Sequence, residues 1–178
     1  MAKKSFPLSK IYSLLESGPV VMVTTARTGK INVMPMSWHT MMEFEPPLVG
    51  CIISDLNYSF GLLKATGECV INIPTVEIAK EAVGCGNVSG AKIDKFEKFG
   101  LTPKPASVVG APLIEECYVN CECRVVDKSM LSKYCLFVLE VVKAWIDPKV
   151  KNPQTIHHLG KENFMIAGKV IKIKSKMK

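Results

Sequence analysis

Several features that mark other classes of protein are missing from this chain of 178 residues. No apolar run approaches the roughly 20 residues that a membrane-spanning helix needs. The N-terminal segment MAKKSFPLSK lacks the apolar stretch of a signal peptide. With no export signal, we expect a soluble cytoplasmic protein whose seven cysteines are reduced thiols.

Metal-binding patterns are missing as well, because none of the cysteines forms a C-x-x-C pair. Cys117, Cys121 and Cys123 fall on one face of one expected strand. Side chains two residues apart on a strand stand about 7 Å apart, too far for one tetrahedral zinc ion. His157 and His158 are neighbours in the sequence and diverge on any regular element. We therefore expect small core cysteines and no metal site.

Aromatic residues are also few, at 7% of the chain. No expected strand interleaves them with basic residues, as platforms for nucleic acid do. The net charge is nevertheless +7, and much of the excess lies in lysines of the tail between residues 169 and 178. Such a tail is typical of a solvated chain end. Nucleic acid is therefore not an expected partner, whereas the charge suits a phosphorylated cofactor or an acidic protein.

The composition, with 48% hydrophobic and 22% charged residues, suits one folded domain over residues 1–178. β-Branched runs and period-two patterns predict strands over residues 20–26, 31–36, 48–53, 69–73, 116–126 and 134–146. Apolar residues at helical spacing predict helices over residues 8–16, 58–65, 77–83 and 93–99. Segments 37–47, 84–90 and 104–112 are expected to be loops. This order predicts a mainly β fold, a β-barrel with helical insertions.

Two local patterns make sharper predictions. Gly67 suits the C-cap of the helix that begins near Tyr58. Apolar and polar residues alternate along residues 116–126, which predicts a strand with one buried and one exposed face.

Four polar residues stand just before, or at the start of, the helix over 58–65: Ser54, Asp55, Asn57 and Ser59. A plain N-cap accounts for one of them, but four within six positions exceed what a cap needs. Free N–H groups, the positive end of a helix dipole and hydroxyl donors are what an anionic phosphate requires. The charge of Asp55 opposes such an anion, so that side chain is expected to point away or to pair with a lysine. The pattern predicts a bound anionic cofactor.

At these residues the chain resembles a known family. The pattern N-x-x-P-x-S-W is present as Asn32, Pro35, Ser37 and Trp38, and Pro-Pro and the polar segment before the helix follow it. Together with GECVINIP, DKFEKFGLTP and, more weakly, HHLGKENF, this order is similar to that of the flavin reductase and flavoredoxin family. The resemblance covers most of the chain and implies an FMN-binding split β-barrel.

The resemblance also implies roles for individual residues. Ser54, Asn57 and Ser59 are expected at the FMN phosphate. The backbone of the strand exit formed by Pro35, Met36, Ser37, Trp38 and His39 is expected at the pyrimidine edge of the flavin. The side chain of Trp38 suits stacking on the flavin and a core or dimer-interface position equally, and His39 is expected at the surface or at an interface.

Several of the other candidate site residues have a purely structural alternative to the functional role. Asn32 is expected to face the flavin, the alternative being an edge or bulge residue. The amide of Asn72 is expected either at the flavin or in a backbone hydrogen bond. Lys92 is expected to supply charge to the phosphate, whereas Lys95 and Lys98 are expected to be solvated. His158 is a further candidate for the flavin edge, across a dimer interface.

The glycines at 84, 86 and 90 do not fit G-x-G-x-x-G and follow a helix, so a Rossmann site is rejected. The function expected from the resemblance is an FMN-dependent oxidoreductase and homodimer. A nicotinamide cofactor or a reduced protein would donate electrons, and flavin, ferric iron or a protein would accept them. The residues show neither a general base nor an NAD(P)H motif, so the catalytic residues stay unassigned. The alternative is a non-catalytic basic barrel that binds a ligand or nucleic acid.

Overall fold

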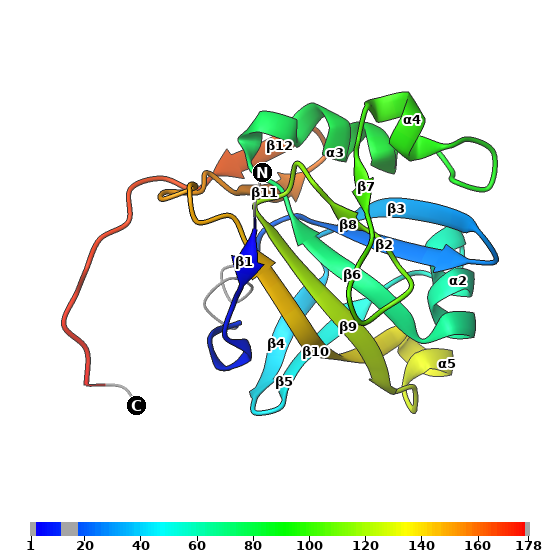
Figure 1. The fold of residues 1–178 in the computed structure, drawn as a ribbon, viewed down its shortest axis with the longest axis horizontal. Coiled ribbons are helices and arrows are strands. Elements are labelled where there is room, and N and C mark those ends of the chain that lie inside the picture. The colour runs from blue at the N-terminus through cyan, green and yellow to red at the C-terminus, as the bar shows by residue number, and fades with distance from the viewer. Residues whose placement is uncertain (1–2, 12–17, 177–178) are drawn as a thin grey trace.

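The computed structural model describes residues 3–11 and 18–176, and its centre is an eight-stranded antiparallel sheet (Figure 1). The main path of the sheet runs in the order β3 (Lys30–Met36), β2 (Val21–Arg27), β6 (Glu68–Ile73), β9 (Val119–Asp127), β10 (Leu136–Ile146), β5 (Pro47–Ile52) and β4 (His39–Phe44), and β1 (Lys4–Ser5) pairs with β10. Strands β3 and β4 are the two ends of this path, so the curled sheet is an open barrel.

The inner face of this sheet forms the main hydrophobic core. Val21 and Val23 of β2, Ile71 of β6, Cys121 of β9 and Leu139 of β10 are all buried there. Alternate residues of antiparallel strands point to the same face, so each strand contributes its own apolar set. Burying a valine, leucine or isoleucine side chain contributes about 1.5–3 kcal/mol, so these apolar runs stabilise the sheet.

Short elements cover the sheet: η1 (Leu8–Lys10), α2 (Tyr58–Thr66), η2 (Val76–Ile78), α3 (Ala79–Gly86), α4 (Lys95–Phe99), β7 (Pro103–Lys104), β8 (Leu113–Ile114), α5 (Leu131–Tyr134), β11 (Ile156–Gly160) and β12 (Asn163–Ile166). Helices α3 and α4 contact β3, and α2 contacts β2 and β3. In Figure 1, α3 and α4 lie above these strands and α2 lies at their right-hand end. β3 is thus flanked by helices on two sides.

Most predicted elements are present, and the capping prediction for α2 is confirmed. Gly67 follows this helix with φ +71°, and its N–H donates to the carbonyl oxygen of Leu63. A positive φ of this kind is costly for other residues and free for glycine. Of the helix expected over residues 8–16, the structure shows η1, while residues 12–17 lie outside the described residues.

The loop prediction is wrong for two segments, which contain regular secondary structure. Segment 37–47 contains the edge strand β4, whose residues are largely exposed and so carry little apolar pattern. Segment 84–90 begins inside α3. Gly84 allows close packing of helices there and does not form a turn. A Cβ at Gly84 would overlap the ring of Phe99, so the missing side chain lets α3 and α4 approach each other. The hairpin of β11 and β12 was also not predicted, and it too carries exposed apolar residues.

The prediction that the strand over 116–126 is half exposed is wrong for the first half of β9, which is buried on both faces. Glu122 is 0% exposed. The loop between β7 and β8 crosses the outer face and donates backbone N–H groups of Ser107, Val108 and Val109 to the Glu122 carboxylate, at 3.0, 2.6 and 3.2 Å. A buried carboxylate is tolerated when several donors surround it.

Cys117, Cys121 and Cys123 are buried, and the described residues contain no group of three or more His, Cys, Asp or Glu side chains arranged to hold a metal ion. None of the helices in the described part of the chain is long and apolar enough to cross a bilayer.

Candidate functional site

A groove made of three adjoining cavities follows β3 from Asn32 to Ser37, and we call it the β3 groove. The first cavity, about 230 Å³, lies between β3, the start of α2 and residues 86–90. The second, about 560 Å³, shares Met34 and Asn57 with the first and reaches α5. The third, about 280 Å³, shares the end of β3 with the second and reaches the β11–β12 hairpin.

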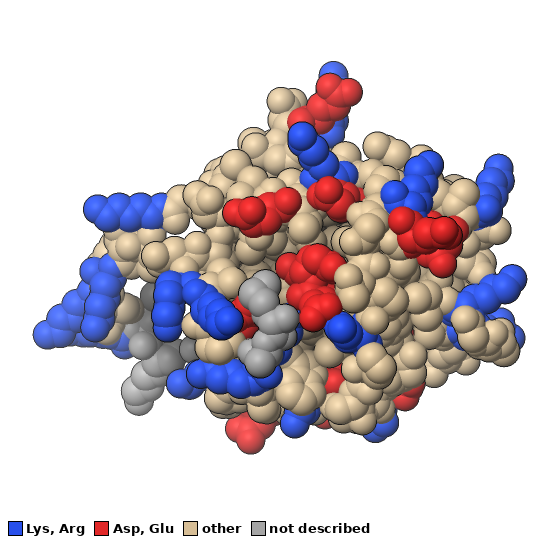
Figure 2. Space-filling view, turned by 45° about the horizontal axis from the view of Figure 1, so that its top comes forward, with Lys and Arg blue, Asp and Glu red and all other residues tan. Residues whose placement is uncertain are grey.

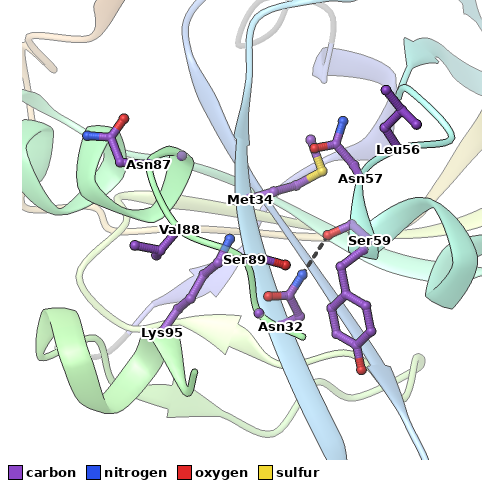
Figure 3. Close-up of a pocket in the computed structure, with 12 residues that line it drawn as sticks. Asn32, Met34, Leu56, Asn57, Ser59, Asn87, Val88, Ser89 and Lys95 are labelled. Atoms are coloured by element: carbon purple, nitrogen blue, oxygen red, sulfur yellow. Dashed lines mark hydrogen bonds between the residues drawn. The ribbon is translucent and has the colours of Figure 1, made fainter. Parts of the chain in front are cut away.

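The first cavity is built on Asn32, which is 2% exposed (Figure 3). Its Nδ2 donates to the hydroxyl oxygen of Ser59 at 2.7 Å. Its Oδ1 is buried and has no hydrogen-bond partner, although buried polar atoms are nearly always paired. A Cβ at Gly90 would overlap this oxygen, so the loop can pass close to Asn32 because residue 90 is glycine. The wall of the cavity therefore contains one buried acceptor without a hydrogen-bond partner among the described residues.

The start of α2 supplies hydrogen-bond donors to the same cavity. Asn57 is the N-cap residue, yet its side chain makes no capping hydrogen bond. Phe60 N–H already donates to the carbonyl oxygen of Asn57 at 3.0 Å. The N–H groups at the very start of a helix have no intrahelical acceptor, and the dipole makes this end positive. Ser59 is 1% exposed and accepts from Asn32, so its own hydroxyl hydrogen is available to donate. Asn57 and Ser59, for which a phosphate role is predicted from the sequence, thus line the same cavity.

A buried lysine completes the first cavity. Lys95 is 6% exposed, and its Nζ donates to the carbonyl oxygens of Val33 at 2.8 Å and Cys85 at 2.7 Å. Burial lowers its pKa, and the neighbouring Cys85 thiol opposes that shift. An ammonium group has three donors, and Lys95 lines the cavity (Figure 3). The prediction that Lys95 is solvated is wrong, because α4 packs against β3 and carries the lysine inward.

Lys92, the lysine chosen from the sequence, lies elsewhere. It is exposed and lines a separate cavity of about 320 Å³ beside Gly90 and Tyr58. It therefore lies next to the first cavity and outside the β3 groove. The two lysines are three residues apart, and the sequence alone gave no reason to prefer the later one.

The second cavity gathers most of the other predicted residues: Pro35, Met36, Ser37, Trp38, Ser54 and His158. β3 is a terminal strand of the sheet path, so within the sheet it pairs with β2 alone. The side chain of Trp38 is 70% exposed, which rules out the core position considered for it. His158 comes from β11; its ring lies 5.1 Å from that of Phe164, and its Nε2 is 3.2 Å from the carbonyl oxygen of Lys161.

Besides Lys92, two predicted residues lie outside the groove. His39 Nε2 is 2.7 Å from the carbonyl oxygen of Pro19, and burial lowers the pKa of the imidazole. Asn72 is 0% exposed. Its Nδ2 donates to the carbonyl oxygen of Met22 at 2.8 Å, and its Oδ1 accepts from Ile114 N–H at 3.0 Å and from Asn120 Nδ2 at 2.7 Å. The hydrogen-bonding alternative for Asn72 is the one that the structure shows.

Several lining residues were not predicted. The loop after α3 contributes Asn87, Val88, Ser89 and Gly90 to the first cavity, and α5 contributes Lys133 and Tyr134 to the second. The glycines of segment 84–90 were a usable signal, since glycine commonly marks a close backbone approach. The α5 residues gave no comparable signal.

Comparison with known proteins places the chain in a family. The family model described as "Flavin reductase like domain" matches residues 15–163. The chain belongs to the flavin reductase-like family. Among curated relatives, an uncharacterized protein of Archaeoglobus fulgidus is 40% identical over 113 residues, which span 64% of each chain. The uncharacterized protein YddH of Escherichia coli K12 is 32% identical over 170 residues, 88% of this chain and 90% of the relative.

Solved structures of flavin reductase-like proteins share the fold. An FMN-binding domain of a flavin reductase-like enzyme from Shewanella baltica matches 97% of this chain and 98% of its own, with a TM-score of 0.91 and 24% identity. Flavoredoxin of Desulfovibrio vulgaris matches 88% and 90%, with a TM-score of 0.79 and 21% identity. The predicted family and the predicted fold, a mainly β split barrel, are thereby confirmed.

Proposed function

We propose that this flavin reductase-like protein binds FMN in the β3 groove and works as an oxidoreductase. The observation that carries the proposal is the first cavity, where a buried cation, a helix N-terminus and a buried unpaired amide oxygen meet. A phosphate monoester needs donors and positive charge. Lys95, Ser59 and the first turn of α2 would hold the phosphate, and Asn32 Oδ1 would accept from a hydroxyl of the ribityl chain.

The second cavity suits the flavin ring. It adjoins the first through Met34 and Asn57, has the larger volume and combines apolar side chains with backbone of a sheet edge. Backbone N–H and C=O groups near Ser37 would meet the pyrimidine edge, as predicted. The ring of Trp38 would cover part of the ring system. Bound flavin supplies hydride and single-electron transfer, and the protein contributes position, hydrogen bonds and exclusion of water.

The proposed electron donor is a nicotinamide cofactor or a reduced electron-transfer protein, and the proposed acceptor is free flavin, ferric iron or a protein. No general base is required of the chain. Its net charge of +7 favours anionic donors of both kinds. We propose a cytoplasmic setting, in which the thiols stay reduced.

We also propose a homodimer. Apolar side chains stand exposed before and on β4 and on the β11–β12 hairpin: Trp38 at 70%, Phe44 at 59% and Met42 at 50%, and Leu159 at 65% and Met165 at 51%. Trp38 and His158 of the hairpin line the second cavity. Contiguous exposed apolar surface commonly marks an interface. Burial of these residues between two copies would also enclose the flavin ring.

The test is flavin titration followed by reduction. Purified protein is titrated with FMN and with riboflavin, and bound flavin is then exposed under anaerobic conditions to NADH, NADPH or a reduced iron–sulfur protein. Tighter binding of FMN than of riboflavin, with bleaching of the yellow colour by one of the three donors, is expected. Failure of FMN to bind refutes the proposal. FMN that binds but that no donor reduces supports the non-catalytic alternative.

A further inference from the structure

The chain leaves the body of the molecule after β12. Ala167 N–H donates to the carbonyl oxygen of Thr155 at 2.8 Å. Residues 168–174 then make no hydrogen bond and no ion pair with the rest of the described chain. In Figure 1 this segment runs out to the left, away from the sheet. We call residues 171–176 the C-terminal arm.

The sequence of the arm has the pattern of a strand. Ile171 and Ile173 are 65% and 75% exposed. Three exposed lysines alternate with them or follow them: Lys172, Lys174 and Lys176. Alternate residues of an extended chain face opposite sides, so the arm has an apolar side and a basic side, and Val170, which precedes it, falls on the basic side. A chain end that stays in water gains nothing from isoleucine at every second position, so this pattern indicates a strand without a partner.

The free edge of β4 offers a matching surface. β4 is a terminal strand of the sheet path and pairs with β5 alone among the described strands, so one row of its backbone N–H and C=O groups is open to a further strand. Met42 and Phe44 are exposed on it. Glu43 and Glu45 are exposed beside them, and neither carboxylate forms an ion pair within the described residues. Glu43 Oε1 accepts from Phe44 N–H at 2.7 Å. The edge is therefore apolar and acidic, where the arm is apolar and basic.

The other terminal strand, β3, does not match the arm. Helices α2, α3 and α4 contact β3, and the three cavities of the β3 groove have no Asp or Glu side chain in their walls. Figure 2 shows the lysines of the tail gathered on the left, apart from the rest of the surface charge. The β4 edge also belongs to the exposed apolar surface that we assign to the homodimer, and the arm follows the hairpin that forms the other part of that surface.

We propose that the C-terminal arm of one copy pairs as an extra strand with the β4 edge of a second copy. Backbone hydrogen bonds supply affinity, the isoleucines cover the exposed apolar side chains of the edge, and the lysines pair with its two glutamates. In a two-fold dimer each copy gives one arm and receives one. This inference rests on the homodimer under the proposed function and names the contact that joins the copies.

The arm is long enough for this contact. An extended residue advances about 3.3 Å, so residues 167–176 together reach about 33 Å, a distance on the scale of the width of one domain. Because the segment points away from its own sheet (Figure 1), a second copy is the nearer recipient of the arm.

The experiment exchanges the charges of the two surfaces on the full chain. Lys172→Glu/Lys174→Glu makes the arm acidic, and Glu43→Lys/Glu45→Lys makes the edge basic, so each variant alone opposes like charges. Each should raise the dissociation constant of the dimer about 10- to 100-fold in sedimentation. An equimolar mixture of the two variants should return to within about threefold of wild type, because both contacts of the mixed dimer again join opposite charges.

Two further measurements accompany the exchange. Lys149→Glu/Lys151→Glu reverses the same charge at two exposed lysines of the loop after β10 and should sediment as wild type does. Hydrogen exchange of the arm amides should be slow in the concentrated dimer and fast after dilution to the monomer, because only a paired strand protects them. Circular dichroism checks that every variant is folded.

The outcomes separate this inference from the homodimer. A wild-type monomer refutes both. A dimer that neither variant weakens keeps the homodimer and refutes the arm contact. A mixture as weak as its two components also overturns the inference, and recovery in one chain that carries all four exchanges would then place the arm on its own β4. Loss of oligonucleotide binding in the arm variant, with an unchanged dimer, would assign the arm to an anionic partner instead. FMN binding is titrated separately.

Discussion

Asn32 on β3 and Ser59 on α2 are joined by a hydrogen bond of 2.7 Å from Nδ2 to Oγ, across 27 residues of sequence. The bond fixes the helix start against the sheet edge. It also sets the direction of both remaining polar groups, since the Ser59 hydroxyl hydrogen must donate elsewhere and Asn32 Oδ1 must accept from elsewhere. This short contact leaves Asn32 Oδ1 without a partner among the described residues.

Removing the polar groups at the start of α2 should release the phosphate. For Asn57→Ala/Ser59→Ala, we expect the Kd of FMN to rise about 10- to 100-fold, because donors to a charged oxygen each contribute about 1.5–3 kcal/mol. Fluorescence titration measures the effect, and circular dichroism checks the fold. The exposed Asn152 and Ser129 provide a control double variant of the same chemistry. Undiminished FMN affinity in the site variant would rule out the phosphate assignment.

Adding one methyl group at residue 90 should disturb the same cavity from the other side. In Gly90→Ala the new Cβ overlaps Asn32 Oδ1, so the amide or the loop must move. We expect the Kd of FMN to rise about tenfold or more. Gly61→Ala is the matched control, because nothing lies within 4 Å of a Cβ there. That change inside α2 should stabilise the protein by about 0.5–1 kcal/mol, and an equal loss of FMN affinity in both variants would contradict the prediction.

A charged residue on the exposed apolar surface should prevent the proposed homodimer. Trp38→Arg places a cation where an interface would have to desolvate it, at a cost of several kcal/mol. Sedimentation should show a dimer for wild type and a monomer for this variant. Val170→Arg serves as control, since Val170 is 79% exposed and lies in the tail. A wild-type protein that sediments as a monomer would rule out the proposed dimer interface.

The sequence showed the fold better than the site, for a physical reason. Buried strands such as β2 and β6 carry continuous β-branched runs, and Gly67 marks a helix end by its backbone geometry. The burial of Lys95 depends instead on how α4 packs against β3, which no local pattern records. The role of Asn72 could not be decided from the sequence, because a buried asparagine has the same local pattern whether it hydrogen-bonds to a ligand or to the neighbouring strands.

The burial of Glu122 likewise depends on tertiary packing that no local pattern records. It leads to a prediction about stability and pH. Burial would raise the pKa of its carboxyl, but hydrogen bonds from Trp145, Ser107 and Val108 outweigh it and the pKa is lowered. Trp145 Nε1 donates at 2.8 Å. A lowered folded-state pKa contributes stability that is present above the unfolded value of about 4.3 and is lost as pH falls through the folded value.

The variant Glu122→Gln should therefore lose about 1–3 kcal/mol of unfolding free energy at pH 7, because a neutral amide accepts these donors less well. Wild type should lose this part of its stability on acidification below about pH 4.3, and the variant should not. Urea denaturation at a series of pH values measures both. Glu77→Gln, at an exposed position, should leave the stability unchanged within about 0.5 kcal/mol. Parallel pH profiles for wild type and Glu122→Gln would show that the carboxylate contributes nothing.

Lys95 should make phosphate binding depend on pH in the alkaline range. Because burial lowers its pKa below 10.5, the folded protein loses this proton before an exposed lysine does. The affinity for FMN should fall as pH rises through the lowered pKa, while riboflavin, which has no phosphate, should keep its affinity. Between the folded pKa and 10.5 the unfolded chain binds more protons, so the free energy of unfolding should rise over the same window in which FMN is lost.

The variant Lys95→Met tests both halves of that argument at once. It keeps a long apolar stem and removes the charge, so it should reduce the preference for FMN over riboflavin and remove the pH dependence of the ratio of their Kd values. Lys98→Met, three residues on and exposed, should bind FMN as wild type does. Titrations with both flavins over the alkaline range measure the ratio directly. A Lys95→Met protein that still prefers FMN over riboflavin by the wild-type factor would mean that the buried ammonium serves only the carbonyl oxygens of Val33 and Cys85, and that the phosphate is held by the start of α2 alone.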